Sequence, residues 1–121
     1  MTEADDAQLG IELRDAAIEQ AYRAALEAWK EAARDAIREV ARHRAHFTTD
    51  AVWTLLDHWD VERVREPRAI AGVLRAAVAD GEIEATGELR NSVLPRGHRR
   101  RVMVYRSRLY ENPLLRTEAT G

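Results

Sequence analysis

Arginine side chains concentrate in one segment of this 121-residue chain. Residues 90–108 contain seven arginines and no acidic residue, whereas residues 1–89 contain 11 basic and 19 acidic residues. A guanidinium group is a planar fork of N–H donors that matches phosphate oxygens. Because exposed charges are screened beyond about 8 Å at physiological salt, a polyanion would respond to this arginine segment rather than to the net charge of −2.

The candidate DNA contacts lie within the arginine segment and in a predicted helix before it. Arg68 falls in the first turn of that helix, the part that usually approaches base edges, and Arg65 precedes it. Arg75 is two turns further on, where contact with the DNA backbone or with solvent is expected. The full candidate set is Arg65, Arg68, Arg75, Arg90, Asn91, Ser92, Arg96, His98, Arg99, Arg100 and Arg101.

The arginine segment also has a simpler interpretation. An arginine-rich loop can be merely solvated, or it can anchor the acidic residues 1–40. The elements around the loop decide between these readings, and a helix, a strand, the loop and a second strand in that order favour DNA contact.

Residues 66–86 organise the chain. Pro67 suits the first position of a helix, and Gly81 can supply the left-handed residue that ends one, so we expect a helix over 67–80. Residues 82–86 then alternate polar and apolar side chains, as a half-buried strand does. The packed face of the helix should carry Ile70, Val73, Leu74, Ala77 and Val78.

Residues 87–101 contain two glycines and a proline, which predicts a loop with turns, and residues 102–107 supply a β-branched and aromatic return strand. The two strands would pair antiparallel with the arginines at the tip of their loop. Helix, strand, loop and strand in this order predict the recognition helix and wing of a winged-helix domain.

A further helix is expected over residues 49–57. Thr48 or Thr49 can cap it, Asp50 suits its first turn, and Phe47 can pack against Val52 across the cap. A minimal strand is expected near Phe47. The helix should face Ile70 and Leu74 with Val52, Leu55, Leu56 and Trp59, leaving Trp53 at the edge.

Residues 9–46 are alanine-rich and free of proline, which predicts helix. One helix would be roughly 58 Å long, so we expect a break or bend near Leu26–Trp29. Two apolar stripes need two partners, which could be the rest of the monomer or a second copy of the chain. The stripes comprise Ile18, Tyr22, Ala25, Trp29, Ala32 and Ala36 on one side, and Leu26, Ala33, Ile37 and Val40 on the other.

The expected fold class is therefore α+β and mostly α. We expect a helical extension over residues 1–40 that can act as a dimerisation element, a winged helix-turn-helix domain over 41–108 and a C-terminal tail over 109–121.

Several function classes find no support in the sequence. No apolar run approaches the ~20 residues of a membrane span, and the acidic start lacks a secretory h-region, so we expect a cytoplasmic protein. The chain has no cysteine, and no nucleotide-binding or nucleophile motif stands out. His43, His46 and Asp50 are candidates for a metal set, but a histidine pair at a helix end is more often surface-exposed. We expect neither an enzyme nor a cofactor.

Four stretches resemble one family. FTTDAVW (47–53), EPRAIAGVLRAAVADGEI (66–83), the spaced Ser92, Pro95 and His98, and VMVYRSR (102–108) look like small winged helix-turn-helix proteins encoded by actinobacterial phages and prophages. The resemblance implies DNA binding, whether by a repressor, a replication accessory factor or a modulator of host proteins. Tyr105 stands where a tryptophan is expected, which keeps an aromatic anchor.

The expected function is binding of double-stranded DNA that regulates transcription or replication by occupancy. The helix over 67–80 would enter the major groove, and the wing over 87–101 would contact phosphates or the minor groove. The alternative is a protein–protein interaction module that binds a host or phage protein. The acidic balance of residues 1–89, including Glu66 beside the groove helix, favours that alternative.

Overall fold

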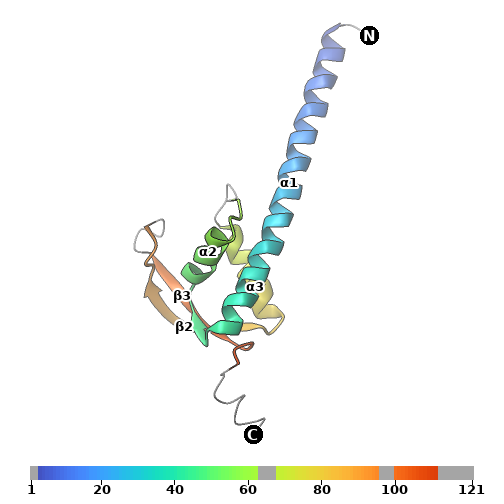
Figure 1. The fold of residues 1–121 in the computed structure, drawn as a ribbon. Coiled ribbons are helices and arrows are strands. Elements are labelled where there is room, and N and C mark those ends of the chain that lie inside the picture. Colours follow the sequence, from blue (N-terminus) through green and yellow to red (C-terminus); the bar gives the residue numbers. More distant parts are fainter. Residues whose placement is uncertain (1–2, 63–67, 96–99, 112–121) are drawn as a thin grey trace.

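The structure, a computed structural model, describes residues 3–62, 68–95 and 100–111 (Figure 1). In these ranges the fold is α+β and mostly helical, and its antiparallel sheet has the strand order β1-β3-β2. The elements are α1 (Glu3–His43), β1 (His46–Phe47), α2 (Thr49–His58), α3 (Ala69–Ala79), β2 (Ile83–Asn91) and β3 (Arg101–Ser107).

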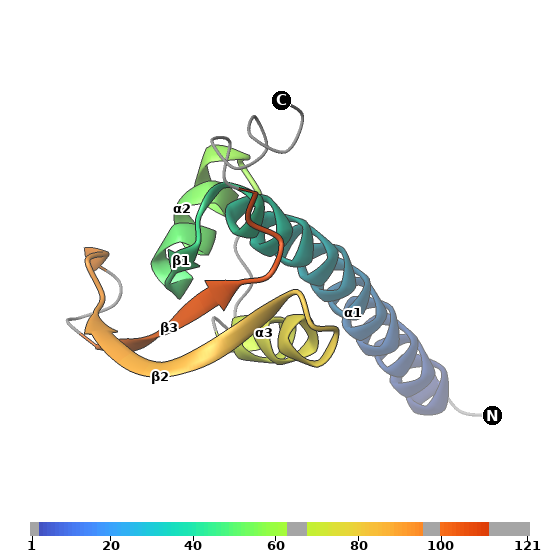
Figure 2. The same ribbon diagram turned by 90° about the horizontal axis from the view of Figure 1, so that it is seen from below.

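The helix α1 is continuous over 41 residues, so the expected break near Leu26–Trp29 is wrong. No proline lies within it, and Gly10, near its start, is its single glycine. Its N-terminal half projects from the rest of the molecule, as Figures 1 and 2 show. Burial begins at Trp29, and from there both apolar stripes pack inside the monomer. The buried residues of α1 are Trp29, Ala33, Ala36, Ile37, Val40 and Ala41.

The helix α2 begins at Thr49, and Thr48, one of the two expected cap residues, is its N-cap: the Thr48 hydroxyl oxygen accepts a hydrogen bond from the Asp50 N–H at 3.3 Å. Val52 and Leu56 are buried, as expected for its inner face. The two tryptophans exchange their expected places. Trp59 follows the last helical residue and is 41% exposed, whereas Trp53 packs beside Trp29 with 5.8 Å between ring centroids.

The helix α3 spans Ala69–Ala79 with Arg68 at its N-cap, and Pro67 lies outside the described residues. Gly81 has φ 75°, as its predicted role in ending the helix requires. Four of the five residues expected on the packed face, Ile70, Val73, Leu74 and Ala77, are buried. Val78 is the exception, because it lies at the flank of that face and is exposed.

The sheet confirms the expected strand pairing and corrects one boundary. β2 and β3 pair antiparallel from Ile83↔Ser107 to Asn91↔Arg101, and β1 pairs with β3 so that Phe47 stacks on Tyr105. β2 continues to Asn91, five residues beyond the predicted end. Gly87, expected in the loop, has φ 82° and lies at an irregularity in the register between Ala85 and Leu89.

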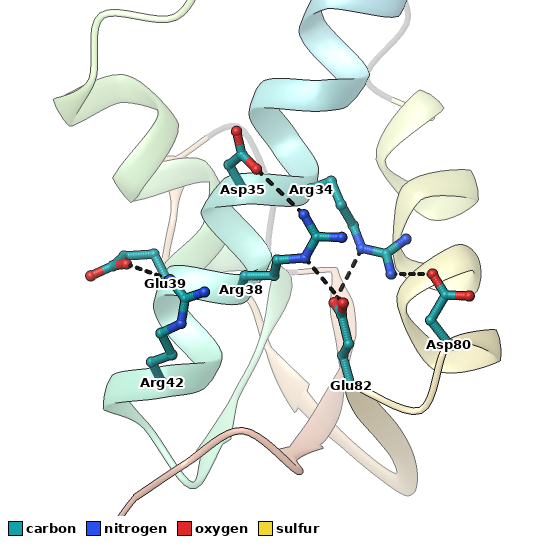
Figure 3. A network of polar contacts seen from close by, with 7 residues as sticks. All are labelled: Arg34, Asp35, Arg38, Glu39, Arg42, Asp80 and Glu82. Carbon is teal, nitrogen blue, oxygen red and sulfur yellow. Dashed lines mark hydrogen bonds and ion pairs between the residues drawn. The ribbon is translucent and has the colours of Figure 1, made fainter.

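An ion-pair network joins α1 to the turn between α3 and β2 (Figure 3). Glu82 accepts hydrogen bonds from Arg34 Nε at 3.2 Å and from Arg38 Nε at 3.0 Å. Arg34 also donates to Asp80 at 2.6 Å. Burial of Glu82 opposes its charged form, but the hydrogen bonds and positive charges of Arg34 and Arg38 outweigh that effect and lower its pKa. The network therefore fixes the start of β2 against α1.

We predict that Glu82→Gln lowers the free energy of unfolding by about 1–3 kcal/mol at pH 7, because Arg34 and Arg38 lose the carboxylate between them. Glu27→Gln is the matched control, since its ion pair with Lys30 is exposed, and should cost less than about 0.5 kcal/mol. Urea unfolding of the three proteins measures both values.

The contribution of Glu82 to stability should depend on pH, because its pKa is lowered in the folded protein. Since the pKa of Glu82 is lower in the folded state, its stabilisation is complete above the unfolded pKa of about 4.3 and is lost as the pH falls through the folded pKa. The difference between wild type and Glu82→Gln should shrink in acid. A difference that stays constant down to pH 2 would contradict this role of the carboxylate.

Candidate nucleic-acid interface

The outward face of α3 presents two arginines. Arg68 and Arg75 are seven residues apart, so they lie on one side of the helix about 10 Å apart along its axis. The guanidinium of Arg75 lies over Gly72, because its Nη2 would be 4.0 Å from a Cβ added there. Both arginines are exposed, and the described residues offer neither an ion-pair partner. This face can therefore offer two cations to a phosphate backbone.

The end of the β2–β3 hairpin presents two further arginines. Arg100 and Arg101 are exposed, and no ion pair joins either of them to another residue in the described ranges. Ser92 N–H donates to the Arg100 carbonyl at 2.7 Å, which continues the pairing beyond the last strand residues. Four further candidates, Arg65, Arg96, His98 and Arg99, lie outside the described residues.

Other arginines of the segment 90–108 are balanced by neighbouring acids. Arg106 and Arg108 both bind Glu84 on the adjacent strand. The hydrogen bond from Arg108 is the largest of the effects that lower the pKa of Glu84. Arg90 pairs with Glu88 at 3.3 Å. The sequence count therefore overestimates the positive charge that this hairpin offers to a ligand.

Ser92 does not belong to the exposed candidate set. It is buried, and its hydroxyl donates to Asp50 Oδ1 at 2.7 Å, while Val93 N–H donates to Asp50 Oδ2 at 2.8 Å. The Asp50 carboxylate therefore holds the end of β2 against the first turn of α2. Sequence reasoning missed this contact because the two side chains are 42 residues apart and carry no motif.

His43, His46 and Asp50 do not form a metal set. His43 Nε2 lies 2.8 Å from Glu39 one turn away on α1, and Asp50 is engaged by Ser92 and Val93. The part of the chain that the structure describes contains no group of three histidine or acidic side chains arranged to hold a metal ion.

Acidic side chains lie near one flank of α3. A hollow of about 360 Å³ separates α1 from α3, with Glu27 and Glu31 on one wall and Ala69, Gly72 and Ala76 on the other. Lys30 and Arg34 share the acidic wall, but Lys30 pairs with Glu27, and Arg34 pairs with Asp80 and Glu82. These acidic side chains therefore lie across the hollow from α3, and Gly72, over which the Arg75 guanidinium lies, lines the same hollow.

No protein-family model, no curated protein and no solved structure matches this chain. Among the described helices, none combines the length and the apolar character that crossing a bilayer demands.

We predict that Asp50→Ala frees the end of the hairpin. The Ser92 hydroxyl and the Val93 N–H lose a charged acceptor, so stability should fall by about 1.5–3 kcal/mol. Amide hydrogen exchange should accelerate at Val93 and Ser92 more than at Ile83, at the other end of β2. Glu88→Gln, which alters an exposed ion pair, is the control. Equal acceleration along the whole strand would show global destabilisation instead.

Proposed function

We propose that this chain is a winged helix-turn-helix protein that binds double-stranded DNA, of the kind that actinobacterial phages and prophages encode. The element order helix, strand, two helices and a two-stranded hairpin, with β1 added beside β3, is compatible with that fold. The observation that carries the proposal is the display of arginines without ion pairs, within the described residues, on two elements: Arg68 and Arg75 on α3, and Arg100 and Arg101 on the hairpin.

In this proposal α3 enters the major groove and the end of the β2–β3 hairpin contacts phosphates or the minor groove. Arg68, at the N-terminus of α3, is the residue best placed to read a base edge. The exposed residues of α3 between Arg68 and Arg75 are Ala71 and Gly72, which allow close approach but offer few groups that distinguish bases; Gly72 also lines the hollow that Glu27 and Glu31 face. Phosphate contacts therefore supply most of the affinity, and sequence preference is modest.

The proposed mechanism is occupancy. A protein bound at a chosen position blocks or recruits the machinery of transcription or replication and catalyses nothing itself. The proposed site of action is the cytoplasm of the host cell, where the DNA is accessible.

Fluorescence anisotropy with a labelled duplex at several salt concentrations tests the proposal. The logarithm of affinity should fall with the logarithm of salt concentration by about 0.9 for each phosphate contacted. Arg100→Ala combined with Arg101→Ala should reduce that slope by about 0.9 for each lost contact, and Arg68→Ala should also weaken discrimination between sequences.

Arg23→Gln is the control variant, because Arg23 lies on the projecting part of α1 and pairs with Glu19. Its salt slope should match that of the wild type. Absence of binding at low salt would overturn the proposal, and an unchanged slope in the hairpin variants would place the phosphate contacts elsewhere.

One observation favours a protein-interaction module as the second candidate. Glu27 and Glu31 lie across a hollow from α3, and this acidic wall disfavours a polyanion along that flank. The same hollow offers small side chains that a protein partner could approach closely. Under this alternative the duplex does not bind at low salt, and the Arg68 and Arg100 variants behave as wild type.

We also propose that two copies associate through the projecting part of α1. Residues 12–28 are exposed apart from Tyr22 and Leu26, which are half-buried, and Leu13 and Ile18 are each more than 60% exposed. Because most of the stability of a protein helix comes from packing of its apolar face, a partner helix that covers Leu13 and Ile18 would stabilise this segment.

Light scattering on a sizing column tests this association. We expect twice the monomer mass of 13.8 kDa for the wild type, and the monomer mass for Ile18→Glu. Arg14→Gln, a change on the exposed surface of the same segment, should leave the dimer intact. A wild-type monomer at about 100 μM would contradict the proposal; a dimer would predict DNA half-sites about one helical turn apart.

A further inference from the structure

An open cleft of about 730 Å³ lies between the C-terminal end of α1, β1, α2 and the end of β2. It shares no residue with the hollow beside α3. Its size is within the range of roughly 300–1,000 Å³ that small-molecule sites occupy. The cleft is therefore large enough for one small organic ligand.

The floor of the cleft is apolar. Val40 of α1 and Phe47 of β1 are buried beneath it, and Ala51 and Leu55 of α2 are half-buried along one side. Val93, at the other side, is 84% exposed. A ligand that covered this floor would gain free energy in proportion to the apolar area removed from water.

The rim of the cleft carries arginine and histidine side chains. Arg44, His46 and His58 are exposed around it, and Arg90 and Asn91 of β2 form the opposite wall. Arg44 has no ion-pair partner among the residues that the structure describes. Its guanidinium is therefore available as a fork of N–H donors for a carboxylate or another small anion.

The two acidic residues of the cleft are already satisfied. Asp50 accepts hydrogen bonds from Ser92 and Val93, and Glu39 pairs with Arg42 and His43. Because both carboxylates are occupied, neither competes for Arg44. Two arginines line the cleft. Arg90 forms an ion pair with Glu88, whereas Arg44 forms none within the described residues.

We propose that this cleft binds a small organic anion with an apolar body, whose charged group pairs with Arg44 and whose body lies on Phe47, Ala51 and Leu55. This site goes beyond DNA binding and does not depend on it. A ligand bound here also touches Arg90 and Asn91 at the end of β2. Only that consequence, an effect on the hairpin as a DNA contact, rests on the proposed function.

The probe is 1-naphthoate, an aromatic bicycle with one carboxylate, and the measurement is isothermal titration calorimetry with the full chain. We expect saturable binding with one site per chain and a dissociation constant on the order of 10⁻⁴–10⁻³ M, as the ligand's size allows. Naphthalen-1-ylmethanol, which lacks the charge, should bind about tenfold more weakly.

Three variants locate the site. Arg44→Gln should weaken naphthoate binding about tenfold while leaving the neutral alcohol unaffected, and Arg44→Lys, which keeps the charge, should restore part of the affinity. Ala51→Leu fills the floor and should abolish binding of both ligands. Arg23→Gln, far from the cleft on α1, should bind both as wild type does.

Thermal unfolding of each variant confirms that it is folded, and amide chemical shifts of the wild type show where naphthoate lies. Shift changes confined to residues such as Arg44, Ala51 and Asn91 support the site. The proposal is overturned if naphthoate does not saturate, if the shifts occur elsewhere, or if neither Arg44→Gln nor Ala51→Leu changes its affinity.

Discussion

The fold depends on burial of the C-terminal half of α1. Residues 29–41 of this helix contribute six members of the buried core, and both α2 and α3 contact it. Alanines at 33, 36 and 41 are fully buried, so the neighbouring helices can approach closely, while Trp29 and Ile37 supply bulk at the same surface. The apolar area removed from water here holds the two shorter helices, which would not be stable alone.

Two carboxylates then orient β2, one at each end. Glu82 stands just before the strand and binds Arg34 and Arg38 of α1, whereas Asp50 of α2 binds Ser92 and Val93 just after it. Both are charge-assisted contacts across elements far apart in sequence. A strand held at both ends keeps the β2–β3 hairpin in a defined direction relative to the helices.

Ion pairs with nearby carboxylates also decide which arginines can bind an external anion. Glu84 and Glu88 take up Arg106, Arg108 and Arg90, so the strand arginines mainly stabilise the hairpin. Other arginines remain exposed without such a pair within the described residues. Arg100 and Arg101 lie at the end of the hairpin, Arg68 and Arg75 lie on α3, and Arg44 lines the cleft between α1, β1, α2 and β2. The functional proposals rest on these last five side chains, because a cation that lacks a protein carboxylate can neutralise a ligand's charge instead.

The sequence alone determined most element positions, because local signals set them. Short stretches of sequence predict a cap at Thr48 or Thr49, the glycine after α3 and the β-branched return strand, and the structure has Thr48 as the cap, Gly81 in the left-handed conformation and β3 at that place. The sequence also predicted the buried face of α3 correctly for four residues: Ile70, Val73, Leu74 and Ala77. Helical spacing is a property of neighbouring residues, so it needs no knowledge of the partner element.

Only the tertiary structure decided what each element packs against. It joined Trp53 rather than Trp59 to Trp29, and it extended β2 to Asn91 through pairing with Arg101. The structure also shows that Ser92 is buried against Asp50, so Ser92 is no longer a candidate DNA contact. These outcomes depend on contacts between residues tens of positions apart, whose free energy no local pattern of residues records.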